Sequence, residues 1–318
     1  MKLSNVGAIG FGCLIWAGVA SAQNAISAKS GMVNYIEGTV LLDGQPVKVK
    51  IDNFPQVRNG SELRTEEGRA EVLLGPGVFL RLGENSAVRM ISNDIMNSRL
   101  EFLGGTAIVE SAELEKDESV GLTYKGSSID LLKKGVYRFD GEPPQVSVYD
   151  GEARVISDGQ AQIVKRSHLL HLDGVAVAEK FDEKETGDST LRWARRRAEY
   201  LAVANVSAAR EAEQYGSWGS NNWIWNPFFG TFTYLPMGGM YDSFWGYRFW
   251  SPDSVYLLYV PRQNYWYPGA ASSSATAAAV STGASRPGST GLLSGGAGGR
   301  ETPSAPVFGR GGTSARGH

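Results

Sequence analysis

The chain has 318 residues and an almost balanced charge, with 31 Lys and Arg against 33 Asp and Glu. It therefore offers no basic surplus to attract nucleic acid, and we expect no nucleic-acid partner. The sequence holds one cysteine, which excludes a disulfide framework and a cysteine-based zinc site. The length is sufficient for one large hydrophobic core with further segments attached.

Residues 1–22 have the pattern of a secretory signal peptide. A short positive start precedes an apolar run over residues 6–19, and Ala20-Ser21-Ala22 is a small-x-small cleavage pattern. We therefore expect cleavage between Ala22 and Gln23, no transmembrane segment afterwards, and a location in the periplasm or at the cell surface. The alternatives are an uncleaved membrane anchor and a lipoprotein. The apolar run is short for a span of about 20 residues, and Cys13 lies inside it rather than at the cleavage point.

Residues 29–180 alternate apolar and polar side chains. Val78, Leu80 and Leu82 share one face, while Arg81 points away from it. A period of two indicates strands that each bury one face. We therefore predict a mainly β domain of stacked β-hairpins, arranged as a twisted β-sandwich or a short β-solenoid-like fold.

Five dipeptides in this domain have Asn or Asp followed by Gly. Both positions tolerate the positive φ of a tight hairpin turn. We therefore predict turns at each, and expect Val146 and Val148 to pair with Ala153 and Val155 across one of them. The five dipeptides are Asp43-Gly44, Asn59-Gly60, Asp140-Gly141, Asp150-Gly151 and Asp158-Gly159.

A Gly-x-Ala-x-Val motif recurs in the same domain. Its Gly suits the exit from a turn, and its Ala suits a core position where only a small side chain fits. We therefore expect the Ala of each copy to face the core between closely stacked layers. The three copies begin at Gly68, Gly105 and Gly151, and a looser fourth begins at Gly38.

Residues 185–214 change to helical spacing. Leu191, Ala194, Ala198 and Leu201 recur every three or four residues, with Asp188 or Ser189 as the N-cap. The run Arg195-Arg196-Arg197 is interpreted as a solvated face of this helix rather than a nucleic-acid or membrane contact.

Residues 215–267 are an aromatic segment, in which 19 of 53 residues are Trp, Tyr or Phe. Gly, Asn and Pro between the rings indicate short irregular strands and turns held by aromatic packing. We expect this segment to pack on the β domain, because so many exposed rings would favour aggregation. Residues 268–318 are rich in Gly, Ala, Ser and Thr and are predicted to form a disordered tail. The candidate ligand contacts of the aromatic segment are Trp218, Trp223, Trp225, Trp245 and Trp250, with an internal aromatic core as the alternative.

Several motifs of the β domain resemble the FecR-like extracytoplasmic domain family. They include residues 57–65, the first Gly-x-Ala-x-Val copy at Gly68, and the stretch Arg81-Leu82-Gly83-Glu84-Asn85-Ser86. Two later stretches, residues 135–139 and 146–155, are similar to its closing hairpins. The resemblance covers residues 30–165 and implies a scaffold for protein contact or envelope sensing. The best-known members also control a sigma factor through a cytoplasmic segment, where this chain has the predicted signal peptide.

The residues give no sign of a catalytic or cofactor site. His168 and His171 are expected on a strand, where positions three apart face opposite ways, so we predict no metal site. The acidic run that includes Glu110, Glu113 and Glu118 is interpreted as a solvated loop. The sequence also lacks a serine elbow and the glycine-rich loops that bind phosphates or dinucleotides. We expect no catalytic residues, metal or cofactor.

The predicted function is therefore that of a non-catalytic exported envelope protein. Its FecR-like β domain would act as a protein-docking or signal-sensing module, with an envelope protein as partner. The alternative is a surface protein that binds glycan or peptidoglycan through the aromatic segment. In that case the partner would be a cell-wall polysaccharide, which stacks on exposed aromatic rings.

Overall fold

The computed structural model describes residues 30–49, 54–114, 117–173, 177–182, 187–215 and 222–259. All of them belong to one compact unit that extends to Arg262. The predicted signal peptide, its cleavage site at Ala22 and Gln23, Trp218 and the predicted tail at 268–318 lie outside the described residues.

Fifteen strands form one large, strongly curved sheet, in the order β13-β12-β9-β8-β6-β5-β3-β4-β7-β10-β11-β14-β15, with β1 beside β3 and β2 beside β1. All neighbours are antiparallel except β6 and β8, which are parallel. The strands are β1 Met32–Leu42, β2 Gln45–Pro46, β3 Glu62–Gly75, β4 Val78–Leu82, β5 Ala87–Asp94, β6 Asn97–Gly104, β7 Thr106–Ser111, β8 Ser119–Tyr124, β9 Ser127–Leu131, β10 Gly135–Gly141, β11 Pro144–Asp150, β12 Glu152–Ser157, β13 Gln160–Lys165, β14 His168–His171 and β15 Ala178–Lys180.

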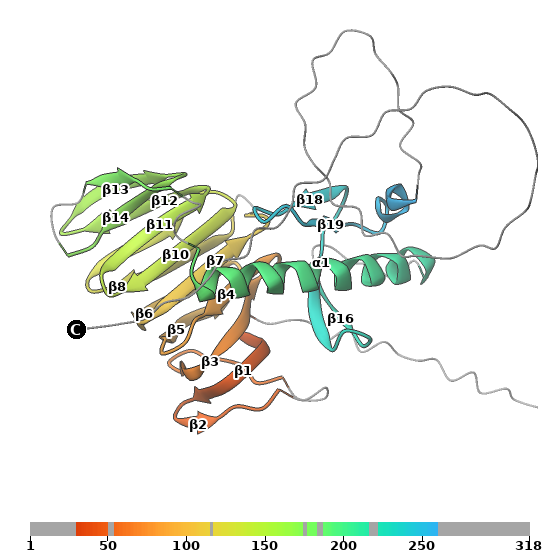
Figure 1. The fold of residues 1–318 in the computed structure, drawn as a ribbon, viewed down its shortest axis with the longest axis horizontal. Coiled ribbons are helices and arrows are strands. Elements are labelled where there is room, and N and C mark those ends of the chain that lie inside the picture. Colours follow the sequence, from red (N-terminus) through yellow and green to blue (C-terminus); the bar gives the residue numbers. More distant parts are fainter. Residues whose placement is uncertain are drawn as a thin grey trace, which may run out of the picture. The chain divides into compact units, whose positions relative to one another are not determined.

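The long strand β3 divides this sheet into two layers (Figure 1). Its first residues, Glu62–Arg64, pair with β5, whereas residues 70–75 pair with β4. We call β5, β6, β8, β9, β12 and β13 the open layer, and β4, β7, β10, β11, β14 and β15 the covered layer. The main core joins them, for example where Phe102 of β6 lies 6.5 Å from Phe139 of β10 between ring centroids. The predicted mainly β, sandwich-like fold is thereby confirmed.

The alanines of the three Gly-x-Ala-x-Val copies all lie in this core. Ala70, Ala107 and Ala153 are completely buried, as expected for small side chains between close layers. The glycines of the copies do not share one role. Gly105 and Gly151 have φ of 85° and 95°, whereas Gly68 lies within β3. A Cβ on Gly68 would come 2.6 Å from backbone atoms of β1, so this glycine permits close strand contact.

Three of the predicted hairpin turns are wrong. Asn59-Gly60 forms a turn, but it joins a segment that bridges β1 to the start of β3 and closes no hairpin. Asp140 and Gly141 belong to β10, and the turn to β11 follows them. The Asp150-Gly151 turn is a corner between layers, because β11 pairs with β10 and β14 while β12 pairs with β9 and β13. The expected pairing of Val146 and Val148 with Ala153 and Val155 is therefore also wrong. The hydroxyl of Tyr137 stabilises this corner by hydrogen bonds with the backbone oxygen and N–H of Glu152.

Helix α1 spans Ser189–Tyr215 and packs on the covered layer beside β7 (Figure 1). Its first turn is capped by Asp188, whose Oδ1 accepts the N–H of Leu191 at 2.9 Å, as predicted. Leu191 and Ala194 pack against Ile108 and Val136 of the covered layer. Of the described helices only α1 is long, and it has no apolar stretch suited to crossing a bilayer.

Residues 222–259, the described part of the aromatic segment, form two small hairpins and one short helix. Trp223 of the first hairpin lies 4.6 Å from Phe79 of β4 between ring centroids, and Phe232 and Tyr234 join the same cluster with Leu201 of α1. The segment thus packs on the covered layer and on the helix, as expected. Its elements are β16 Asn222–Asn226 with β17 Thr231–Leu235, β18 Met240–Asp242 with β19 Arg248–Trp250, and the 3₁₀ helix η1 Val255–Leu258.

Candidate functional site

A buried charge cluster lies on the outer side of the covered layer. Arg81 of β4 is completely buried. Its Nε donates to Oε2 of Glu71 on β3 at 2.9 Å, and its Nη1 donates to Oε2 of Glu110 on β7 at 2.5 Å. Strand alternation places these three side chains on the face opposite the main core, where α1 and the aromatic segment cover them. Arg81 therefore points away from the core, as predicted, but is not solvated.

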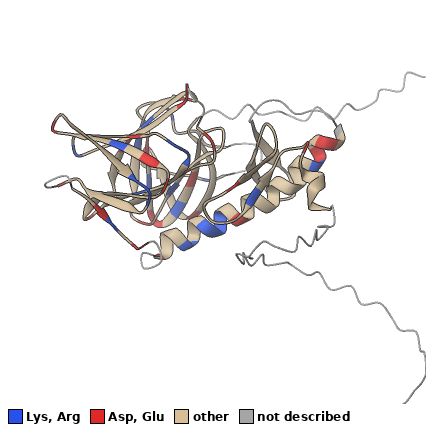
Figure 2. Ribbon diagram, turned by 90° about the horizontal axis from the view of Figure 1, so that it is seen from above, with Lys and Arg blue, Asp and Glu red and all other residues tan. Residues whose placement is uncertain are grey.

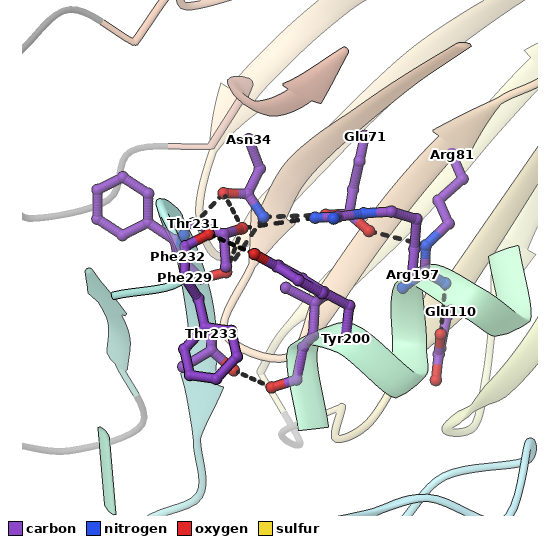
Figure 3. A network of polar contacts seen from close by, with 11 residues as sticks. Asn34, Glu71, Arg81, Glu110, Arg197, Tyr200, Phe229, Thr231, Phe232 and Thr233 are labelled. Atoms are coloured by element: carbon purple, nitrogen blue, oxygen red, sulfur yellow. Dashed lines mark hydrogen bonds and ion pairs between the residues drawn. The ribbon is translucent and has the colours of Figure 1, made fainter. Parts of the chain in front are cut away.

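The helix and the aromatic segment both contact this cluster (Figure 3). Arg197 of α1 donates from Nη2 to Oε1 of Glu71 at 2.9 Å, and Asn34 of β1 donates to the same oxygen at 2.9 Å. The amide of Asn34 also accepts the N–H of Phe232 at 2.9 Å and donates to its carbonyl at 3.1 Å. Asn34 thereby satisfies the backbone N–H and carbonyl groups of Phe232 in β17, much as a neighbouring strand would.

The charges of the cluster compensate one another. Burial alone would raise the pKa of the Glu71 carboxyl, but the guanidiniums of Arg197 and Arg81 hold this pKa at about 2. On the far side, the indole N–H of Trp245 donates to Oε2 of Glu110 at 3.0 Å. The Glu71 carboxylate therefore stays ionised and engaged at neutral pH. The cluster therefore fixes the helix and the aromatic segment to the sheet rather than presenting a group for acid–base chemistry.

Two sequence interpretations of this region are wrong. Arg197 was expected on a solvated face with Arg195 and Arg196, but its side chain is 8% exposed, whereas its two neighbours are exposed. Glu110 was expected in a solvated loop, but it lies in β7 and is buried. Both errors have one cause, because the sequence does not show that an outer strand face will be covered by a distant helix.

The open layer has a different outer surface, which carries a ladder of ion pairs across its strands. Arg99 of β6 binds Asp130 of β9 at 2.5 Å, and Arg154 of β12 binds the other oxygen of Asp130 at 2.9 Å. A second row on the same face places Arg89 of β5 beside Glu101, at 2.7 Å. These groups are partly exposed, so the ladder lies at a surface open to a partner.

Gly121 makes the ladder possible. It lies on β8, directly between Arg99 on one side and Asp130 on the other. A Cβ on Gly121 would come 2.0 Å from Nη1 of Arg99, so any larger residue would block the path of the guanidinium across the strand. The absent side chain lets one Arg reach two strands away.

Isoleucines accompany this ladder on the open layer. Ile163 of β13 pairs with Arg154, and Ile156 of β12 follows two residues later on the same face. The two are 40% and 36% exposed, and Ile91 of β5 is 51% exposed. The open layer thus combines a fixed pattern of charge with exposed apolar side chains. We take this face, defined by Arg99, Asp130, Arg154, Ile156 and Ile163, as the candidate functional site and call it the ladder face.

The predicted ligand-contact tryptophans have different environments. Trp223 and Trp250 are both 6% exposed, and each belongs to a buried cluster. Trp225 and Trp245 are partly exposed, and Trp225 lies against Phe54 at 5.0 Å between centroids. Trp218 lies outside the described residues. Ligand binding by these residues stays a prediction.

His168 and His171 lie on strand β14, and both are partly exposed. The Nδ1 atom of His168 lies 2.8 Å from the carbonyl of Arg166. The described part of the chain contains no group of three His, Cys, Asp or Glu side chains arranged to hold a metal ion. The charge cluster and the ladder face were both missed from the sequence. The only signal for the first was an arginine within the otherwise apolar strand 78–82.

Comparisons with known proteins found only a weak structural similarity. No known protein family and no curated protein matches the sequence. Two crystal structures of a proposed anti-sigma factor from Parabacteroides distasonis ATCC 8503, at 2.50 and 1.65 Å resolution, are similar with a TM-score of 0.34 and 14% identity. The matched region covers 39% of this chain and 61% of the other, less than two thirds of its length. At this TM-score the likeness assigns no function.

Proposed function

We propose that this chain is a non-catalytic, exported envelope protein whose β domain docks a protein partner through the ladder face. The single observation that supports this role is the difference between the two layers. The covered layer uses its outer face to hold α1 and the aromatic segment. The outer face of the open layer presents ion-paired charge and exposed isoleucines.

The chemistry of the ladder face suits a protein partner. Specific interfaces combine apolar anchors with charges fixed in defined positions, which select the partner and set its orientation. Asp130 holds two arginines in place, so their remaining N–H groups have a defined direction. Ile156 and Ile163 supply apolar area beside them. A partner with carboxylates spaced to meet Arg99 and Arg154 would complement this face.

Affinity capture with matched variants tests the proposal. The full chain is used as bait for an envelope extract, together with the double variant Ile156→Asp, Ile163→Asp and the control Tyr256→Asp on η1. All three positions are exposed, so each variant should fold, as circular dichroism would verify. We expect one protein to be captured by the wild type and by the control, and to be lost with the double variant. Capture unchanged by the double variant, or no protein above background, would refute docking at this face.

The proposed location is tested separately by fractionating cells that express the chain. We expect the processed protein, beginning at Gln23, in the periplasmic or surface fraction. Recovery of an unprocessed chain in the cytoplasm would contradict export.

Glycan binding remains a second candidate because Trp225 and Trp245 are partly exposed. Titration with soluble peptidoglycan fragments, followed by tryptophan fluorescence, tests it. Binding through these rings should be lost in Trp225→Ala and kept in Ile163→Ser. An emission spectrum that does not change on titration would exclude a stacking role.

A further inference from the structure

The outer face of α1 and the tip of the adjoining hairpin form a second exposed surface, apart from the ladder face. Arg192, Arg196, Tyr200, Val203 and Arg210 recur at helical spacing and lie on one stripe of the helix. All five are exposed, with Tyr200 at 39% and Val203 at 53%. Figure 2 shows Lys and Arg positions recurring along the helix. Over 27 residues the helix is about 40 Å long.

The most exposed large apolar side chain of the described residues lies beside this stripe. Phe228 is 86% exposed and forms part of the turn between β16 and β17. The turn is fixed, because Oδ1 of the buried Asn226 accepts the N–H groups of Phe228 at 3.0 Å and Phe229 at 3.3 Å. Nδ2 of Asn226 donates to the carbonyl of Ala204 on α1 at 2.9 Å.

Tyr200 joins the turn to the helix stripe. Its hydroxyl donates to the carbonyl of Phe229 at 2.6 Å, and the two rings meet edge to face at 5.5 Å between centroids. Two hydrogen bonds within the turn and two to the helix therefore fix the backbone of the turn that carries the exposed Phe228. Because the turn is already ordered, burying this ring away from water would require no further loss of conformational entropy in the turn.

We propose that this surface, which we call the helix stripe, contacts an anionic lipid bilayer. The phenyl ring of Phe228 enters the headgroup and acyl boundary, and Arg192, Arg196 and Arg210 lie over lipid phosphates. Interfacial attachment needs both an apolar insertion and basic charge, and this surface holds both. Tyrosine is also common at the level of lipid headgroups.

The charge along the stripe supports a lipid surface over an apolar protein groove. Three arginines project from it, and Glu199, the residue before Tyr200, accepts a hydrogen bond from the hydroxyl of Tyr247 at 3.2 Å. Glu211 flanks Arg210, so the negative charge lies toward the C-terminal end of the helix. The guanidinium of Arg210 stacks on Tyr259 at 4.2 Å, which places another ring beside a phosphate-binding group.

A label that reports polarity at single positions tests the proposal in the full chain. The variant Phe228→Cys, in a Cys13→Ser background, carries a polarity-sensitive fluorophore at the hairpin tip. Ile163→Cys in the same background is the matched control, because it is exposed on the ladder face. The apolar run at residues 6–19 could attach every variant to vesicles. The test therefore depends on the difference between the two labels and not on the total amount of vesicle binding.

We expect the label at 228 to shift to the blue with vesicles containing about a third phosphatidylglycerol, and the label at 163 to stay unchanged. In the labelled chain, replacing Arg192 and Arg196 by Gln should lower the apparent affinity about 25-fold, at about fivefold for each arginine. Raising the salt concentration from about 0.1 M to about 0.5 M should weaken the shift.

Equal shifts at both positions, or none at 228, would overturn the proposal. A shift at 228 with an envelope protein extract but not with vesicles would identify a protein groove and also overturn it. None of these results depends on whether the ladder face binds a partner.

Discussion

Removal of Arg81 gives the sharpest test of the charge cluster. The variant Arg81→Met keeps much of the side-chain length but takes away the positive charge between Glu71 and Glu110. Glu71 retains Arg197 and Asn34, but Glu110 keeps only the neutral N–H of Trp245 among its named partners. The variant therefore leaves one buried carboxylate without a compensating charge.

The expected loss in unfolding free energy is about 3–5 kcal/mol, the usual cost of removing one partner from a buried ion pair. Domains of this kind are stable by about 5–15 kcal/mol in total, so the variant should lose about a fifth of its stability or more. A fall in Tm of about 6–20 °C should accompany it, at about 2–4 °C for each kcal/mol.

A double-mutant cycle separates the charge from the packing. In Arg81→Met, Glu110→Gln both charges are gone, and the amide can still accept the N–H of Trp245. Replacing a whole buried ion pair costs little, so the double variant should lie within about 2 kcal/mol of the wild type. Urea unfolding followed by tryptophan fluorescence measures each term. A coupling energy below about 0.5 kcal/mol would refute our account, because it would mean that the two side chains act independently.

Three further predictions follow from the same structure. The folded pKa of Glu71 is about 2, below the unfolded value of 4.5, so this group contributes about 3 kcal/mol to the unfolding free energy above pH 4.5. The contribution is lost as the pH falls toward 2. Glu71→Gln should lack this component of acid unfolding, and an unchanged acid-stability profile would contradict the prediction. Ala107→Leu should overfill the core and lower the unfolding free energy by about 1–3 kcal/mol or more, as urea unfolding would measure. The exposed control Ala161→Leu should change it by less than about 0.5 kcal/mol. Equal effects would contradict close packing of the layers. Gly121→Ala should displace the Arg99 side chain and lower the unfolding free energy by about 1 kcal/mol. The same substitution in an Arg99→Ala background should lower it by less. An equal loss in both backgrounds would show that the ladder does not explain this glycine.

The local patterns of the sequence predicted the strands and the helix well. Alternation placed Val78, Leu80 and Leu82 on one face, and all three are buried in the core. The alanines of the repeated motif also face that core, because a small residue two positions after a glycine follows the same period of two. These features depend on neighbours in the chain, which a sequence displays directly.

The turn at Asp150-Gly151 marks the limit of such reasoning. Its dipeptide favours positive φ, and Gly151 has it, but the same turn chemistry serves a hairpin and a corner between layers. At this corner the hydroxyl of Tyr137 forms hydrogen bonds with the backbone of Glu152 from a different strand. The sequence separation between those residues hides this contact.

The candidate surfaces depend on tertiary structure to a greater degree. The sequence by itself determined a mainly β chain with one helix, a small residue at each repeated core position, and an outward direction for Arg81. Only the fold decided that Arg81, Glu110 and Arg197 meet under a helix, while Arg99, Asp130 and Arg154 remain at an open face. The physical reason is that a strand has two faces. The period of two in the sequence indicates which face points into the core, but it does not indicate which element covers the other face.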